Sequence, residues 1–124
     1  MGQRSKHQQG NWIRAPRRSA IYARDNHTCQ WCGKDSSVEP VQLTLDHIVA
    51  KSAGGSNDCV NLITACAECN SYRRDMSAPA FARHLGDTGC GNSVDILKRI
   101  RRQANRACYS PVTGMRFANK GKGQ

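Results

Sequence analysis

The chain has 124 residues, and its 19 Lys and Arg against 9 Asp and Glu give a formal net charge of +10. Only 38% of the residues are apolar, and no run approaches the roughly 20 apolar residues of a membrane span, which excludes an integral membrane protein and predicts one small domain with a sparse core. Because no apolar export segment follows the polar N-terminus, we expect an intracellular protein, located in the cytoplasm.

The first half of the chain predicts a helix followed by a β-hairpin. Residues 1–15 are polar and basic and are expected to form a mobile arm. A short helix is predicted over residues 16–26, because the segment opens on a proline. Alternating apolar and polar side chains over residues 41–46 predict a half-buried strand, and residues 61–64 return as its antiparallel partner. Residues 51–58, rich in glycine and small polar side chains, form the loop between them.

The second half of the chain predicts three helices. The first begins between Cys66 and Cys69 and ends before Pro79. Ser77 is the predicted N-cap of the second, over residues 78–85, which Gly86 terminates. The third is capped by Ser93 and covers residues 94–108, with an inner stripe of Val94, Leu97, Ile100 and Ala104. These assignments divide the chain into the arm, a core of residues 16–86, a basic C-terminal helix of residues 87–115 packed on that core, and a basic tail of residues 116–124.

Basic residues gather near the two ends of the chain. Residues 1–24 carry six of them and residues 96–124 carry eight, with no acid in either segment, whereas residues 25–95 carry five bases and nine acids. Two basic flanks around a mildly acidic centre indicate a polyanion as partner. A solvated surface without a partner is the weaker alternative, because acids are absent from both flanks. Nucleic acid is favoured over anionic lipid, because neither flank shows a strong apolar face of Trp, Phe and Leu.

Four of the seven cysteines form two Cys-x-x-Cys pairs, Cys29 with Cys32 and Cys66 with Cys69, and 33 residues separate the pairs. Four thiolates are the ligands of a closed tetrahedral zinc site, so we expect one structural zinc to stabilise the sparse core. Thiol redox chemistry is the alternative for a single pair, and two pairs in one small domain make it less favoured. Three cysteines remain, each expected to be a small buried residue, with the first of them as the alternative zinc ligand: Cys59, Cys90 and Cys108.

An ordered set of motifs lies between and around these cysteine pairs. It runs from Leu45-Asp46-His47-Ile48-Val49 through Gly54-Gly55-Ser-Asn57-Asp58 and Asn61-Leu62 to Cys66-Ala-Glu-Cys69-Asn70. Taken alone, adjacent Asp and His are a weak signal. The ordered set resembles the HNH endonucleases (the ββα-metal or His-Me finger family), in the variety with a four-cysteine zinc, over roughly half of the chain. The resemblance implies an α+β fold, with a small zinc-stapled ββα-metal core between the basic helical flanks.

The resemblance also implies roles for four residues. His47 matches the general base that takes a proton from the attacking water, and Asp46 matches the carboxylate ligand of a catalytic divalent metal. Asn61 matches the asparagine that supports the loop and the orientation of the histidine. Asn70 takes the third signature position, which is histidine in many members and asparagine in others, as the second protein ligand of the metal.

The chemistry of these side chains agrees with such roles. Histidine is the side chain best suited to be a neutral base at cellular pH. Oxygen ligands from a carboxylate and an amide suit Mg²⁺ or Mn²⁺ and leave positions open for water and phosphate oxygens. Neighbouring residues of a regular strand face opposite sides, so Asp46 and His47 can serve one site only if the strand ends or bulges there.

Basic side chains on two helices are the predicted contacts to DNA phosphates. If Asn70 lies on a helix, Arg73 and Arg74 share its face, and a solvated helix surface is the alternative for both. The last predicted helix supplies the second set of contacts: Lys98, Arg99, Arg101 and Arg102.

We therefore predict a metal-dependent endonuclease that hydrolyses phosphodiester bonds in DNA, with zinc as the structural ion and Mg²⁺ or Mn²⁺ as the catalytic ion. By the resemblance, the products are 5′-phosphate and 3′-hydroxyl ends. One alternative is a zinc-stabilised module that binds nucleic acid without cleaving it. The other is a subunit of a restriction or phage-packaging complex that cleaves only with partner proteins.

Overall fold

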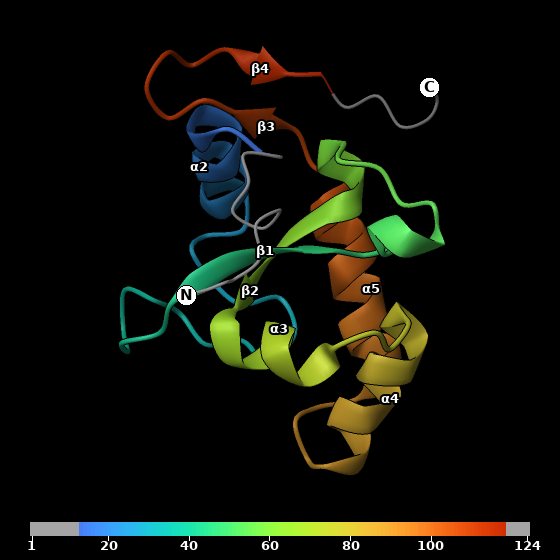
Figure 1. Cartoon of the computed structure of the whole chain (residues 1–124). Coiled ribbons are helices and arrows are strands. Elements are labelled where there is room, and N and C mark those ends of the chain that lie inside the picture. The colour runs from blue at the N-terminus through green and yellow to red at the C-terminus, as the bar shows by residue number, and fades with distance from the viewer. Residues whose placement is uncertain (1–12, 119–124) are drawn as a thin grey trace, which may run out of the picture.

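A computed structural model of the chain describes residues 13–118 as a helix, a β-hairpin, three helices and a second, short hairpin (Figure 1). The elements are α2 (Ala15–Arg24), β1 (Leu43–His47), the 3-10 turns η1 (Lys51–Ala53) and η2 (Cys59–Asn61), β2 (Leu62–Cys66), α3 (Ala67–Arg73), α4 (Ala78–Asp87), α5 (Ser93–Ala104), β3 (Cys108–Tyr109) and β4 (Arg116–Phe117). No helix within the described residues combines the length and the apolar character that a membrane span requires.

A ββα unit lies at the centre of the structure. β1 pairs with β2 in antiparallel register, from Leu43 opposite Cys66 to His47 opposite Leu62. Helix α3 follows β2 directly, and the Sγ of its N-cap, Cys66, accepts a hydrogen bond from the Cys69 amide at 3.4 Å. The mixed helix and strand content around four clustered cysteines confirms the predicted α+β class.

Strand β2 is buried at all five positions because helices cover both of its faces. On one face, Ile63 and Ala65 belong to a cluster with residues of α4 and α5, including Phe81 and Ile100. On the other face, Leu62 belongs to a second cluster with Ile21 of α2 and Cys108 of β3. A strand covered on both sides shows no apolar–polar alternation, in contrast to β1.

A buried ion pair connects α2 to the rest of the domain. Arg24 and Asp25 are 6% and 1% exposed, and two nitrogens of the guanidinium donate to the two carboxylate oxygens at 2.8 and 3.1 Å. Arg24 also donates to the backbone carbonyls of Cys59, Leu62 and Ala104, so one side chain joins α2 to η2, β2 and the end of α5.

Replacement of Asp25 by alanine is expected to lower the free energy of unfolding by about 3–5 kcal/mol, because it leaves the buried Arg24 charge without its partner. The Asp25 carboxylate also accepts a hydrogen bond from the Thr64 amide at 2.9 Å, which alanine cannot replace. Urea unfolding followed by circular dichroism measures the change. Asp87→Ala, which removes an exposed carboxylate from the end of α4, is the control and should shift the free energy by no more than about 0.5 kcal/mol. Equal stability of the two variants would contradict this role of the ion pair.

The predicted N-cap of the last helix was wrong, and so was one of the four residues of its predicted inner face, Val94. Asn92 rather than Ser93 is the N-cap, because its Oδ1 accepts from the amides of Val94 and Asp95 at 2.9 and 3.2 Å. Val94 is 57% exposed, and Ile96 is buried in its place. Ile96, Ile100 and Ala104 follow one another at intervals of four residues, so all three face the core.

Other predicted boundaries also shifted. Helix α5 ends at Ala104, and Cys108 lies in β3. Helix α4 continues through Gly86 to Asp87. Of the three remaining cysteines, Cys59 and Cys108 are buried as expected, whereas Cys90 is exposed.

The ends of the described chain are structured. Arg116, expected in the tail, pairs with Tyr109 in the β3–β4 hairpin. Ile13, expected in the arm, is 3% exposed and packs in the same cluster as Ile21. The rest of the arm, residues 1–12, and the rest of the tail, residues 119–124, lie outside the described residues.

Candidate active site

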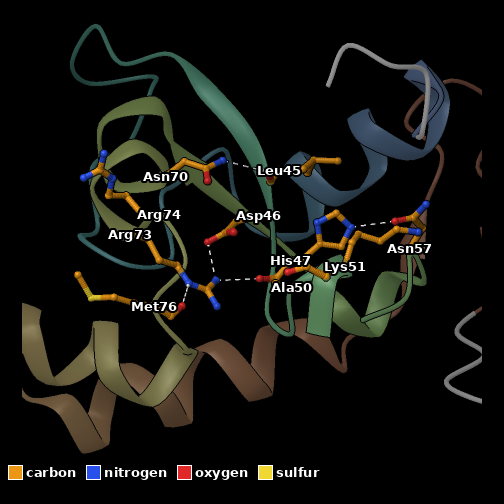
Figure 2. Close-up of a pocket in the computed structure, with 11 residues that line it drawn as sticks. Leu45, Asp46, His47, Ala50, Lys51, Asn57, Asn70, Arg73, Arg74 and Met76 are labelled. Carbon is orange, nitrogen blue, oxygen red and sulfur yellow. Dashed lines mark hydrogen bonds and ion pairs between the residues drawn. The ribbon is translucent and has the colours of Figure 1, made fainter. Parts of the chain in front are cut away.

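A cavity of about 580 Å³ lies where β1 ends, between α3 and the loop that follows the strand. Five of the residues for which the sequence predicted a role in catalysis, metal binding or DNA binding line it, together with residues of the loop and of the α3–α4 connection. The lining consists of Leu45, Asp46, His47, Ala50, Lys51, Ser52, Asn57, Asn70, Arg73, Arg74 and Met76 (Figure 2). Asp46 and His47 share this cavity although they are neighbours, and His47 is the last residue of β1.

The His47 ring is held by the loop. Its Nε2 lies 2.8 Å from Asn57 Oδ1, and because the amide oxygen only accepts, the ring carries its proton on Nε2. Burial lowers the pKa of His47 below its ordinary value, although the hydrogen bond to Asn57 and the charge of Asp46 act in the opposite direction. A neutral ring with Nε2 protonated has its basic lone pair on Nδ1.

One oxygen of the Asp46 carboxylate has two donors. The indole Nε1 of Trp31 and Nη1 of Arg73 each donate to Asp46 Oδ2 at 2.8 Å. Trp31 is fully buried and lies between Cys29 and Cys32 in the sequence. Its hydrogen bond therefore connects the Asp46 carboxylate to the segment that carries the first cysteine pair. Both donors act on Oδ2, so neither engages Oδ1.

Arg73 lies inside the domain rather than on the surface that we expected for a DNA contact. It is 3% exposed, and apart from Asp46 its donors bind the backbone carbonyls of His47, Ile48 and Met76 at 2.8–2.9 Å. Its guanidinium carbon also lies 5.2 Å from the centre of the Trp31 ring. Arg73 therefore clamps α3 to the end of β1.

The side chain of Asn70 is oriented by β1. Its amide nitrogen donates to Thr44 Oγ1 at 2.9 Å and to the Leu45 carbonyl at 3.2 Å. The amide oxygen points away from these partners, and Figure 2 shows it on the side of the Asp46 carboxylate. The two residues thus offer oxygen atoms to the same part of the cavity.

Asn61 does not line the cavity but braces the loop beside it. Its Oδ1 accepts from the Val49 amide at 2.9 Å, and its Nδ2 donates to the carbonyls of Val49 and Ser56 at 3.0 and 2.8 Å. The loop passes so close to itself that a Cβ on Gly55 would lie 1.8 Å from the Val49 oxygen, so only glycine fits there. This arrangement corresponds to the supporting role that the resemblance implies.

The remaining predicted contacts divide into two groups. Arg74 is exposed at the end of α3, where its backbone adopts a φ of +50°, and Lys98, Arg101 and Arg102 are exposed on α5. Arg99 instead donates to the Gln30 carbonyl at 2.7 and 3.0 Å and to the Trp31 carbonyl at 3.2 Å. Arg99 therefore joins α5 to the segment between the first two cysteines.

The two Cys-x-x-Cys pairs meet at one point. The four Sγ atoms of Cys29, Cys32, Cys66 and Cys69 lie within 4.8 Å of one another and are positioned to hold a metal ion. Hydrogen bonds from Cys29 and Cys69 lower the pKa of Cys32 to about 4, and the hydrogen bonds of Cys69 with Cys29 and Cys32 raise the pKa of Cys69. The lowered pKa favours a thiolate at Cys32, which is the form that binds metals.

The sequence did not indicate two residues that orient the site, Asn57 and Trp31. Asn57 belongs to the glycine-containing loop motif, whose composition indicates a turn and not a hydrogen bond to a histidine in β1. Trp31 lies between two cysteines, and its polar nitrogen was the one available signal, because a buried indole N–H requires an acceptor.

Comparisons with known proteins agree with this geometry. Residues 29–86 match the family model described as HNH endonuclease, so the resemblance inferred from the motifs is confirmed. The match begins at the first clustered cysteine and ends within α4, and it leaves α2 and α5 outside. Neither the comparison with curated proteins nor that with solved structures finds a significant match.

Proposed function

Because residues 29–86 match the HNH endonuclease family model, we propose that the chain is a metal-dependent nuclease that hydrolyses phosphodiester bonds in DNA. The observation that carries the proposal is that Asp46, His47 and Asn70 line the same cavity. The family supports nuclease chemistry in general, and this cavity supports the assignment of particular residues to it.

His47 is the proposed general base. With its Nε2 proton donated to Asn57, the Nδ1 lone pair accepts a proton from a water molecule in the cavity. The water oxygen bonds to phosphorus, the bond from phosphorus to the 3′-oxygen breaks, and that oxygen takes up a proton. The products are a 5′-phosphate and a 3′-hydroxyl end.

Asp46 and Asn70 are the proposed ligands of a catalytic cation. The donors from Trp31 and Arg73 fix Asp46 Oδ2, which would leave Oδ1 to bind an ion, and the orientation of Asn70 supplies a second oxygen. Two oxygen donors fit Mg²⁺ or Mn²⁺. When bound there, such an ion would neutralise charge that develops on the phosphate and on the leaving oxygen.

Zinc is the proposed ion of the cysteine cluster, because four thiolates within 4.8 Å of one another fit its closed tetrahedral coordination. Cys59 lies with Leu62 and Cys108 in the other core cluster and outside the four-cysteine group, so we do not assign it as a ligand.

The exposed bases Arg74, Lys98, Arg101 and Arg102 are the proposed phosphate contacts, and exposed Lys51 joins them because it lines the cavity. The guanidinium groups of Arg73 and Arg99 bind backbone carbonyls, and we assign them structural roles instead.

Supercoiled plasmid incubated with the protein tests the proposal. We expect cleavage with Mg²⁺ or Mn²⁺ and none when neither is present. DNA binding without cleavage at any metal concentration would favour the non-enzymatic module, and cleavage only after addition of a cell extract would favour the partner-dependent subunit.

Replacement of Asn70 by alanine is expected to raise the metal concentration needed for half-maximal cleavage at least about tenfold, because the cation loses an oxygen ligand. Cleavage rate against Mg²⁺ and Mn²⁺ concentration measures the change. Asn70→His restores a ligand and should shift the preference toward Mn²⁺, Co²⁺ or Ni²⁺. Ser71→Ala, an exposed change on the same helix, is the control. If Asn70→Ala keeps the metal curve of the parent, Asn70 is not a ligand.

A further inference from the structure

Asn57 connects the proposed base to a helix outside the matched domain. Its side-chain oxygen lies 2.8 Å from Nε2 of His47, which Figure 2 shows as a dashed line. Its backbone carbonyl accepts a hydrogen bond from Nη2 of Arg17 at 2.6 Å. Arg17 lies in α2, 12 residues before the start of the family match at residue 29.

The loop that carries Asn57 is braced at two consecutive carbonyls. Nδ2 of Asn61 binds the carbonyl of Ser56 at 2.8 Å, and Arg17 binds the next carbonyl, that of Asn57. A surface loop without such braces samples several conformations. The first brace lies within the matched domain, and the second is supplied by this chain's own N-terminal helix.

Helix α2 is a rigid support for the second brace. Ala20 and Ile21, on the turn after Arg17, are fully buried, and the Arg24–Asp25 ion pair fixes the end of the helix. The hydrogen bond from Arg17 is short and involves a charged donor, the kind that contributes most to holding a loop in place.

We propose that Arg17 is a positioning residue for His47, acting through Asn57. By holding the Asn57 carbonyl it keeps the amide oxygen on Nε2, which fixes the orientation of the ring and the nitrogen that carries the proton. The nitrogen that accepts the proton of the attacking water is fixed as a result. This inference rests on the proposed function, in which His47 is the base.

The experiment compares Arg17→Ala, Arg17→Lys and Arg83→Ala. Lysine keeps a charged donor of similar reach, and Arg83→Ala removes the same charge from an exposed position on α4. In Arg17→Ala we expect kcat for plasmid cleavage to fall by up to about 10²-fold with KM little changed, because the base is misplaced while the phosphate contacts remain. Arg17→Lys should recover part of the loss, and Arg83→Ala should keep the kcat of the parent.

A second readout does not depend on cleavage. Nitrogen-15 NMR of the imidazole rings distinguishes a proton on Nε2 from one on Nδ1, and the His47 signals are those absent from the spectrum of His47→Ala. We expect the Nε2–H form in the parent and in Arg17→Lys, and a mixture of both forms in Arg17→Ala. Unchanged ring signals together with an unchanged kcat in a folded Arg17→Ala would overturn the inference. Full cleavage by His47→Ala would instead reject the proposed function, whatever the Arg17 variants show.

Discussion

Replacement of His47 by alanine is expected to reduce the rate of DNA cleavage by at least about 10²-fold, the usual contribution of a general base. The alanine variant lacks Nδ1, the atom that takes the proton of the attacking water in the proposed mechanism. DNA affinity should stay close to that of the parent, because contacts between basic side chains and phosphates determine it and all of them remain.

Single-turnover cleavage with saturating metal, combined with a filter-binding measurement of affinity, separates the two effects. His84→Ala is the matched control, because His84 is an exposed histidine on α4 that stacks on Phe81, with ring centres 6.1 Å apart, and does not line the cavity. Cleavage by His47→Ala at the rate of the parent would reject the mechanism. A parallel loss of affinity would show that the ring contributes to binding rather than to proton transfer.

Replacement of Cys66 by serine is expected to unfold the domain. Binding of a structural zinc contributes about 10–16 kcal/mol of apparent free energy in small zinc domains, more than the whole stability of a domain of this size. Cys66 is in addition the N-cap of α3, the helix that carries Asn70. Strong chelation of the parent should have the same effect. Circular dichroism and the zinc content of the purified protein are the measurements.

Two other cysteine variants are the controls for this prediction. Cys90→Ser makes the same chemical change at an exposed position and should leave both fold and zinc content unchanged. Cys59→Ser tests the alternative ligand and should keep its zinc, because Cys59 is not one of the four clustered thiols. A Cys66→Ser chain that stays folded without metal would contradict the structural role of the ion.

The sequence predicted the ββα unit well because its signals are local. Two Cys-x-x-Cys pairs, an alternating strand and a glycine-containing loop each constrain a few neighbouring residues, and their order along the chain reproduces the hairpin and α3. Strand β2 has no apolar–polar alternation and was predicted only in part, over residues 61–64, as the partner of β1 that returns after the loop.

The roles of the arginines could not be predicted in the same way. Helical spacing places Arg73 near Asn70. This spacing does not distinguish a side chain that binds a phosphate from one that binds backbone carbonyls inside the domain. Whether Arg99 reaches the Gln30 carbonyl depends on how α5 packs against a segment 69 residues away. The inward turn of Ile96 in place of Val94 has the same cause, since both residues are apolar and only the packing of α5 on α4 selects one.

Trp31 has a consequence for any attempt to transplant this site. Its indole is fully buried between two of the clustered cysteines and also positions the carboxylate of Asp46, so the cluster and the cavity have a structural part in common. A designer cannot replace the segment of residues 29–32 by a disulfide-linked or an apolar segment and keep the cavity, because the new segment would also have to present an N–H group at the same place. The smallest segment that can be transplanted with a working site therefore includes residues 29–32 with Trp31, the β1–β2 hairpin and α3.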